Sequence, residues 1–262
     1  MNFLKLLLLR LYQIPPKLRL PFLILSASLI IILFYLVFRP NPNGWEKISK
    51  IGITLPLKYK IHGIDVSHHN GKIDWLRVKK MRFSEEDLRL NFCFLKATEG
   101  MTHSDREFDR NWEQLGKLGI RRGAYHFYIP WRDPESQAKN FINSVKIIKG
   151  DFAPVLDIEK NSLRADNQII EDIEKWLDIV QRHYGVKPII YTNPTFYKKF
   201  IKGNFDDYPL WIADYSKETL KGYGASLWFW QHNQSGWCEG VKGTVDYNVF
   251  LGSQSDLEEF CL

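Results

Sequence analysis

Two carboxylates separated by one apolar residue follow an apolar run in the segment PVLDIEK, residues 154–160. Such a run is typical of a buried strand, in which residues i and i+2 face the same side. Asp157 and Glu159 would therefore point the same way. Close carboxylates repel each other, so one of them tends to hold a proton at neutral pH. A carboxylic acid of this kind can protonate a leaving group, and a pair of acids suits the cleavage of a glycosidic bond.

Strand-like segments that must position these acids alternate with amphipathic helical segments from residue 61 onward. The predicted strands are residues 61–67, 91–100, 121–129, 152–159, 187–193, 209–215, 226–232 and 243–250. The predicted helices are residues 105–118, 134–148 and 167–184. This alternation is typical of an α/β fold with a parallel sheet, and eight strands favour a TIM-like barrel. Because few or only short helices separate the last strands, we expect an irregular (β/α) barrel.

Further acids lie in or at the ends of other predicted strands: Asp65, Glu99, Asp214 and Asp246. In α/β barrels the active site lies at the carboxyl ends of the strands, so acids from distant parts of the chain would meet at one mouth. A single acid at a strand end is more often a helix cap or a solvated loop residue. The repetition of acids across several strands favours the catalytic interpretation.

An uncharged apolar run of eighteen residues, residues 21–38, predicts a transmembrane helix. A cleaved signal peptide would end in small residues, whereas this run is followed by Arg39-Pro40-Asn41-Pro42. We therefore expect four parts: a short basic N-terminal segment (1–20), a membrane anchor (21–38), a tether (39–58) and a catalytic domain (59–262). The basic residues on the two sides of the run are balanced, so the charge count does not orient the anchor.

The net charge of +6 does not indicate a nucleic-acid partner. Residues 1–50 hold seven Lys and Arg and a single acid, whereas the rest of the chain has equal numbers of basic and acidic residues. A protein that binds DNA or RNA needs a basic face. No metal site is predicted either, because the adjacent His68 and His69 would point in different directions on an extended chain and no third ligand has a recognisable spacing.

Three cysteines also lack metal-ligand spacing. Cys93 lies in an apolar strand-like run and is predicted to be a core residue. Whether Cys238 and Cys261 pair is left open by the sequence.

Several motifs in order resemble glycoside hydrolase family 25, the Chalaropsis-type lysozymes or N-acetylmuramidases. They are GIDVSHHNGKIDW (63–75), FLKATEG (94–100), RRGAYHFY (121–128), PVLDIEK (154–160), IIYTN (189–193), LWIADY (210–215), WQH (230–232) and VDYNVF (245–250). The resemblance covers about residues 62–252. It implies cleavage of the β-1,4 bond between N-acetylmuramic acid and N-acetylglucosamine in peptidoglycan, with no cofactor.

By this resemblance Glu159 is the catalytic acid. Asp157 orients the substrate and polarises its acetamido group, which would serve as an internal nucleophile. Asp65 and Asp246 match the family's two other active-site acids. The candidate substrate-binding residues are Tyr125, His126, Tyr191, Trp211, Asp214, Trp230 and Gln231. Direct hydrolysis by the carboxylate pair, retaining or inverting, is left open because the sequence gives no carboxyl separation.

Peptidoglycan lies outside the cytoplasmic membrane, so this substrate places the catalytic domain of a single-pass, monomeric protein on the outer side of that membrane. Two alternatives are a chitinase-like N-acetylhexosaminidase and a non-catalytic, membrane-tethered glycan-binding module. The products released from the glycan distinguish the first alternative. A Glu159→Gln variant that still binds glycan distinguishes the second.

Overall fold

The computed structural model describes residues 15–38, 44–82, 88–160, 162–216 and 220–262. The chain forms two units, residues 1–44 and a compact unit from Trp45 to Leu262. The predicted basic segment 1–20 lies largely outside the described residues.

The first unit contains one apolar helix, α2 (Pro16–Phe38). It ends where the predicted anchor ends but begins before residue 21, since proline suits the first turn of a helix. Its 23 residues correspond to about 35 Å at the usual rise of an α-helix, against about 30 Å of hydrocarbon in a bilayer. By length and composition α2 can cross a membrane, and the described side chains of its apolar part are mostly exposed.

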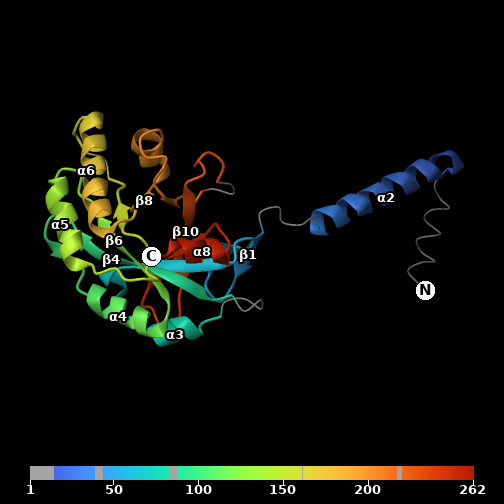
Figure 1. Ribbon diagram of the computed structural model, residues 1–262. Helices are drawn as coiled ribbons and strands as arrows, with labels where there is room; N and C mark the ends of the chain where they lie inside the picture. Colours follow the sequence, from blue (N-terminus) through green and yellow to red (C-terminus); the bar gives the residue numbers. More distant parts are fainter. Residues whose placement is uncertain (1–14, 39–43, 83–87, 161, 217–219) are drawn as a thin grey trace. The chain divides into compact units, whose positions relative to one another are not determined.

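The second unit is an eight-stranded closed barrel with few helices, as the sequence predicted (Figure 1). The barrel strands are β3 (Ile61–Val66), β4 (Leu90–Glu99), β6 (Arg121–Phe127), β7 (Val155–Asp157), β8 (Ile189–Thr192), β9 (Leu210–Ala213), β10 (Leu227–Trp237) and β11 (Thr244–Phe250). Neighbours in the order β3-β11-β10-β9-β8-β7-β6-β4 are hydrogen-bonded, and β3 also pairs with β4, which closes the sheet. All eight predicted strands are present.

One barrel strand departs from the parallel sheet that the sequence pattern suggested. β11 runs antiparallel to both of its neighbours, β10 and β3. The connection from β10 to β11 is too short for the crossover that parallel strands require, so the two form a hairpin. The amino end of β11 consequently lies beside the carboxyl end of β3.

Helices cover the outside of the barrel, with α5 and α6 packed side by side along one part of it (Figure 1). The longer helices are α4 (Phe108–Leu118), α5 (Pro134–Ser144) and α6 (Asp166–Tyr184), close to the three predicted helices. Shorter elements, which the sequence analysis did not predict, are α3 (Trp75–Lys80), α7 (Pro194–Phe196), α8 (Gln254–Phe260), the two-residue strand β5 (His103–Ser104) and two short helical turns (His68–Asn70 and Tyr197–Ile201).

Two apolar clusters hold these layers together. The outer cluster lies between barrel and helices and includes Trp176 and Ile158. The inner cluster fills the barrel with aromatic rings, including Phe92, Phe94 and Phe229. Phe92 and Phe94 alternate along β4, so the two-residue period of the strand sends both to the interior.

The compact unit begins earlier than the sequence suggested. Residues 45–56 form an antiparallel hairpin of β1 (Trp45–Ile48) and β2 (Ile53–Pro56) rather than part of a tether. Trp45 packs edge-on against Trp230, with ring centroids 5.4 Å apart, and four apolar side chains of this region join the outer cluster. The hairpin is missed by the sequence analysis because its strands are only four residues long.

All three cysteines are free thiols in the structure. Cys93 is buried, as predicted. Cys238 packs in the outer cluster, whereas the thiol of Cys261 accepts a hydrogen bond from Arg121 at 3.2 Å.

The aromatic interior depends on a glycine opposite Phe92. A Cβ placed on Gly63 of β3 would lie 2.3 Å from the Phe92 ring. We expect Gly63→Ala to lower the free energy of unfolding by about 1–3 kcal/mol through overpacking, as measured by chemical denaturation. Adding Phe92→Leu should recover part of the loss, because it removes the ring that clashes. An unchanged stability of Gly63→Ala would contradict this account of the barrel interior.

Candidate active site

The carboxyl ends of the parallel strands surround a cavity of about 360 Å³. Seven of the residues predicted for the site line it: Asp65, Asp157, Glu159, Asp246, Tyr125, Tyr191 and Trp211. Glu99, which was expected at the mouth with the other strand-end acids, also lines it, as do five residues that the sequence did not single out for the site: Ser67, His69, Lys96, Phe127 and Lys160. The mouth of the barrel therefore combines acids, cations and aromatic rings.

Strand register brings the acids together from distant parts of the sequence. Asp65 and Asp246 are direct partners in the β3–β11 pair, one near the end of its strand and the other near the start. Asp157 is the last residue of β7, and Glu159 follows two residues later. The intervening Ile158 is buried in the outer cluster, as the alternation of a strand predicts. Asp157 and Glu159 thus reach the cavity together.

A hydrogen-bond network fixes Asp65. Its Oδ2 accepts hydrogen bonds from the side-chain amides of Gln231 and Asn248, each at 2.7 Å. The Gln231 carbonyl accepts hydrogen bonds from the hydroxyls of Tyr191, at 2.9 Å, and Tyr215. The indole N–H of Trp211 donates to the Asn248 carbonyl at 2.8 Å. Gln231 therefore acts beneath the cavity, where it orients an acid.

Burial raises the pKa of both Asp65 and Asp246. Burial raises the pKa of Asp65 well above its usual range, and the nearby charge of Asp246 raises it further. Burial also raises the pKa of Asp246 to about 6, against a smaller lowering by its hydrogen bond with Asp65. Since that shared hydrogen bond raises the pKa of Asp65 and lowers that of Asp246, Asp65 is the proton donor in the pair.

The sequence suggested that repulsion between Asp157 and Glu159 favours retention of a proton, and the pKa shifts agree with this. Burial raises the pKa of Asp157 well above its usual range, and the charge of Glu159 adds to the effect. Burial also raises the pKa of Glu159, and the nearby Lys160 opposes that rise. Among the described residues, no side chain or backbone group hydrogen-bonds to the buried Oδ1 of Asp157. Asp157 itself lines the cavity, so its carboxyl group is placed beside a bound molecule.

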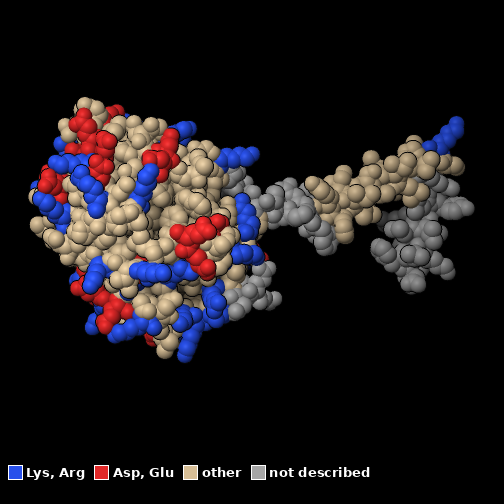
Figure 2. Space-filling model, viewed as in Figure 1, with Lys and Arg blue, Asp and Glu red and all other residues tan. Residues whose placement is uncertain are grey.

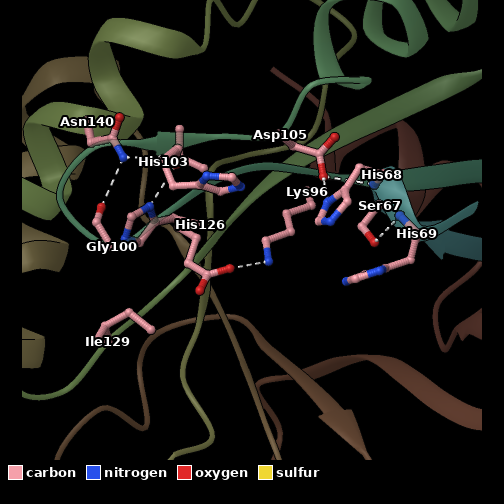
Figure 3. Close-up of polar contacts among 12 residues, drawn as sticks. Ser67, His68, His69, Lys96, Gly100, His103, Asp105, His126, Ile129 and Asn140 are labelled. Atoms are coloured by element: carbon pink, nitrogen blue, oxygen red, sulfur yellow. Dashed lines mark hydrogen bonds and ion pairs between the residues drawn. The ribbon is translucent and has the colours of Figure 1, made fainter. Parts of the chain in front are cut away.

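One ion pair and one histidine–carboxylate hydrogen bond lie on the β3–β4 side of the mouth (Figure 3). Lys96 donates to Glu99 at 2.6 Å, and these two residues stand on one strand. His68 Nδ1 lies 2.8 Å from the buried carboxylate of Asp105, which also accepts a hydrogen bond from the His68 backbone N–H. Within the described ranges, no three His, Cys, Asp or Glu side chains are arranged to hold a metal ion.

Besides Gln231, three predicted substrate-binding residues do not line the cavity. His126 faces the outer layer, where it is fully buried between Thr98, Gln137 and the stacked ring of Trp176. It follows Tyr125 on β6, so the two side chains take opposite faces.

Asp214 and Trp230 are placed outside the cavity by the same alternation. The Asp214 carboxylate accepts hydrogen bonds from the Tyr223 and Ser216 hydroxyls. Trp230 points outward to Trp45 and donates its N–H to the Asp214 backbone carbonyl at 2.9 Å. Neither residue is part of the cavity lining.

Some of the site residues that sequence reasoning missed could have been predicted from the two-residue period of a strand, and one could not. Lys96 follows Phe92 and Phe94 at the same two-residue spacing, so strand parity could have placed it inside the barrel. Asn248 similarly follows Asp246 on one face of β11. Lys160 carries no such signal, because it lies beyond the end of β7.

Comparisons with known proteins agree with this geometry. The model of the family described as "Glycosyl hydrolases family 25" matches residues 64–241. The chain belongs to this family. It is 39% identical over 217 residues to protein YegX of Escherichia coli strain K12, covering 83% of this chain and 79% of that one. It is 31% identical over 212 residues to lysozyme M1 of Streptomyces globisporus, covering 75% and 70%.

The fold also matches solved structures of family 25. A family 25 glycosyl hydrolase from Bacillus anthracis superposes with a TM-score of 0.70 at 29% identity, over 78% of this chain and 95% of that one. The matched residues of the family model include every acid that lines the cavity except Asp246, which lies beyond residue 241.

The buried charge of Asp157 should cost stability. Its raised pKa means that the folded state holds a proton more tightly than the unfolded state, so this group stabilises at low pH and loses that contribution as pH rises. We expect Asp157→Asn to raise the free energy of unfolding at pH 7 by about 1–3 kcal/mol. The gain should disappear near pH 4, as followed by denaturation at several pH values.

Asp256 provides a control of opposite sign. Hydrogen bonds from Ser253 lower the pKa of this exposed carboxylate, which caps α8. Asp256→Asn should therefore reduce stability at pH 7. Equal stability of Asp157→Asn and the unmutated protein at pH 7 would mean that the Asp157 charge is compensated.

Proposed function

We propose that this glycosyl hydrolase is a muramidase, which cleaves the β-1,4 bond between N-acetylmuramic acid and N-acetylglucosamine in peptidoglycan. Its likeness to lysozyme M1 supports this substrate. The observation that carries the mechanism is the pair of carboxyl groups of Asp157 and Glu159, which line one cavity. A sugar with a 2-acetamido group offers an N–H donor to the carboxyl group of Asp157.

Glu159 serves as the general acid in this proposal. Its partly buried position raises its pKa, so a larger fraction of it is protonated near neutral pH than of an exposed glutamate. The protonated carboxyl transfers its proton to the glycosidic oxygen as the bond to the anomeric carbon breaks. The leaving sugar departs with a new hydroxyl group.

Asp157 directs the attack on the anomeric carbon. Its carboxyl group accepts the acetamido N–H and so increases the negative charge on the acetamido oxygen. That oxygen forms a bond to the anomeric carbon as the leaving group departs, which gives a cyclic intermediate. Water then opens the ring, with Glu159 accepting the proton of the water. The configuration at the anomeric carbon is retained because two displacements occur in sequence.

The remaining cavity residues hold the acids and the glycan. Asp65 and Asp246 share a proton and keep the floor of the site hydrogen-bonded without adding two full negative charges beside Asp157. Tyr125, Tyr191 and Trp211 line the walls. Aromatic faces of this kind pack against the apolar faces of sugar rings. One chain supplies the whole cavity, and we propose that the protein acts as a monomer without a metal.

The Glu159→Gln variant tests the reaction. The substitution keeps the shape of the side chain but removes the transferable proton, so turnover of peptidoglycan should fall about 100-fold or more. Glycan binding should be largely unchanged. The assay uses the full chain in mild detergent and identifies products by mass spectrometry.

The products distinguish the alternatives. N-acetylmuramic acid at the new reducing end, released by the unmutated protein alone, supports the muramidase. Reducing-end N-acetylglucosamine, or preferential release of chitin oligomers, would point to a different hydrolase. Binding of glycan without turnover by the unmutated protein would support a binding module.

We further propose that α2 anchors the protein in the cytoplasmic membrane, with the N-terminus inside and the catalytic unit outside. The length and apolar composition of α2 support the anchor, and the location of peptidoglycan supports the orientation. A phosphatase that is active only outside the cytoplasm, fused after Leu262, should be active in intact cells. A fusion active only with a cytoplasmic reporter would contradict this topology.

A further inference from the structure

Charge is distributed unevenly around the cavity. The wall formed by β3 and β11 presents Asp65 and Asp246. The wall formed by β4, β6 and the end of β7 presents two lysines, Lys96 and Lys160, beside three acids, Glu99, Asp157 and Glu159. Both lysines of the cavity lining therefore lie on the second wall.

The two lysines meet over one aromatic ring. Lys96 Nζ lies 4.7 Å and Lys160 Nζ 4.5 Å from the centre of the Phe127 ring. Phe127 is the register partner of Glu99 on one side and of Asp157 on the other. Adjacent strands are about 4.8 Å apart, so the backbone of Phe127 lies about one strand spacing from that of Asp157.

The two lysines differ in how much of their charge is available. Lys96 is buried and forms a 2.6 Å ion pair with Glu99, which compensates it (Figure 3). Lys160 is exposed and, within the described part of the chain, lies within ion-pair distance of no carboxylate. Lys160 therefore offers a charge that a ligand can use. Figure 2 shows that Lys and Arg are common over the surface, so position in the cavity, not charge alone, sets Lys160 apart.

Substrate chemistry places an anion within reach of this lysine. In a muramyl sugar, the 2-acetamido group and the 3-O-lactyl group stand on neighbouring ring carbons. When Asp157 binds the 2-acetamido group, the 3-O-lactyl group projects from the sugar ring toward one of the two strands that flank β7. On the β6 side it meets Phe127 and Lys160, and on the β8 side it meets Tyr191, which carries no charge.

We propose that Lys160 is a specificity-determining residue that binds a carboxylate carried on the 3-O substituent of the muramyl sugar. This inference rests on the proposed muramidase function. It assigns recognition of the 3-O substituent of the muramyl sugar to one residue. The carboxylate is either that of a free lactyl group or one on an attached peptide stem. Both would be held by the same ammonium group against the Phe127 ring.

The test compares Lys160→Gln with the unmutated full chain in mild detergent on three forms of one glycan. The first form carries its peptide stems, the second is stripped of peptides and has free lactyl carboxylates, and the third has those carboxylates converted to neutral methylamides. Lys160→Gln should raise KM on a carboxylate-bearing form about tenfold, as for loss of a hydrogen bond between charged groups, with kcat nearly unchanged. Its KM on the neutral form should equal that of the unmutated protein.

The first two forms distinguish the sources of the carboxylate. A larger loss on the peptide-bearing form assigns Lys160 to the stem, and a larger loss on the stripped form assigns it to the lactyl group. Lys58→Gln is the matched control, because Lys58 also lies over an aromatic ring, 4.8 Å from the centre of Tyr59, but outside the cavity. It should leave KM on all three forms unchanged.

Two results would overturn the proposal. One is an equal rise in KM on all three forms, together with a shift of the alkaline limb of the pH–rate profile to higher pH. That result would mean that Lys160 acts only by lowering the pKa of Glu159. The other is no loss on any form.

Binding of the three forms to Glu159→Gln, with and without Lys160→Gln, gives the same comparison without turnover. A charge preference that depends on Lys160 would then support the proposal even if the unmutated protein released no product. Equal binding of the charged and neutral forms would overturn it. The failure of the proposed reaction is thereby distinguished from the failure of this inference.

Discussion

Closure of the barrel through β3 is the constraint on which the active site depends. β3 pairs with β4 on one side and with β11 on the other, so the first and last barrel strands are neighbours. Asp65 and Asp246, which are far apart in the sequence, become direct register partners. Without that closure, Gln231 and Asn248 could not both reach the same oxygen of Asp65.

Closure of the barrel also creates a buried interior in which the charged form of an acid is destabilised. The lower part of the barrel is packed with aromatic rings, and the acids lie directly above it. Burial is accordingly the largest cause of the raised pKa of Asp65, Asp157, Glu159 and Asp246. This low-polarity environment favours the protonated form of all four acids and so supplies the protonated acid that the reaction needs. The loss of stability that accompanies this arrangement is typical of functional sites.

The cations in the cavity complete the electrostatic arrangement. Lys96 is compensated by Glu99, and Lys160 stands over Phe127 next to the acid pair. Their position places both lysines of the cavity lining on one wall. A muramyl sugar is itself asymmetric, with a neutral acetamido group and an acidic substituent on adjacent carbons. In the proposed role, Lys160 pairs with the acidic substituent while Asp157 binds the acetamido group.

The sequence by itself determined the strands, the longer helices, the apolar helix near the N-terminus and the acids, because each leaves a local pattern. The period of two along β4 and the DIE segment after an apolar run are readable without neighbours. The sequence was a poorer guide to which side chains point into the cavity and which point to the outer layer. His126 and Trp230 were expected in the cavity, and their strands send them to the outer layer.

Only the tertiary structure decided the direction of β11, the inclusion of the β1–β2 hairpin and the position of Lys160. Each depends on contacts between segments remote in the sequence: β11 with β3, Trp45 with Trp230, and Lys160 with Phe127. Local patterns report which side of a strand is apolar. They do not report which strands become neighbours, and it is neighbouring strands that set the charge around the cavity.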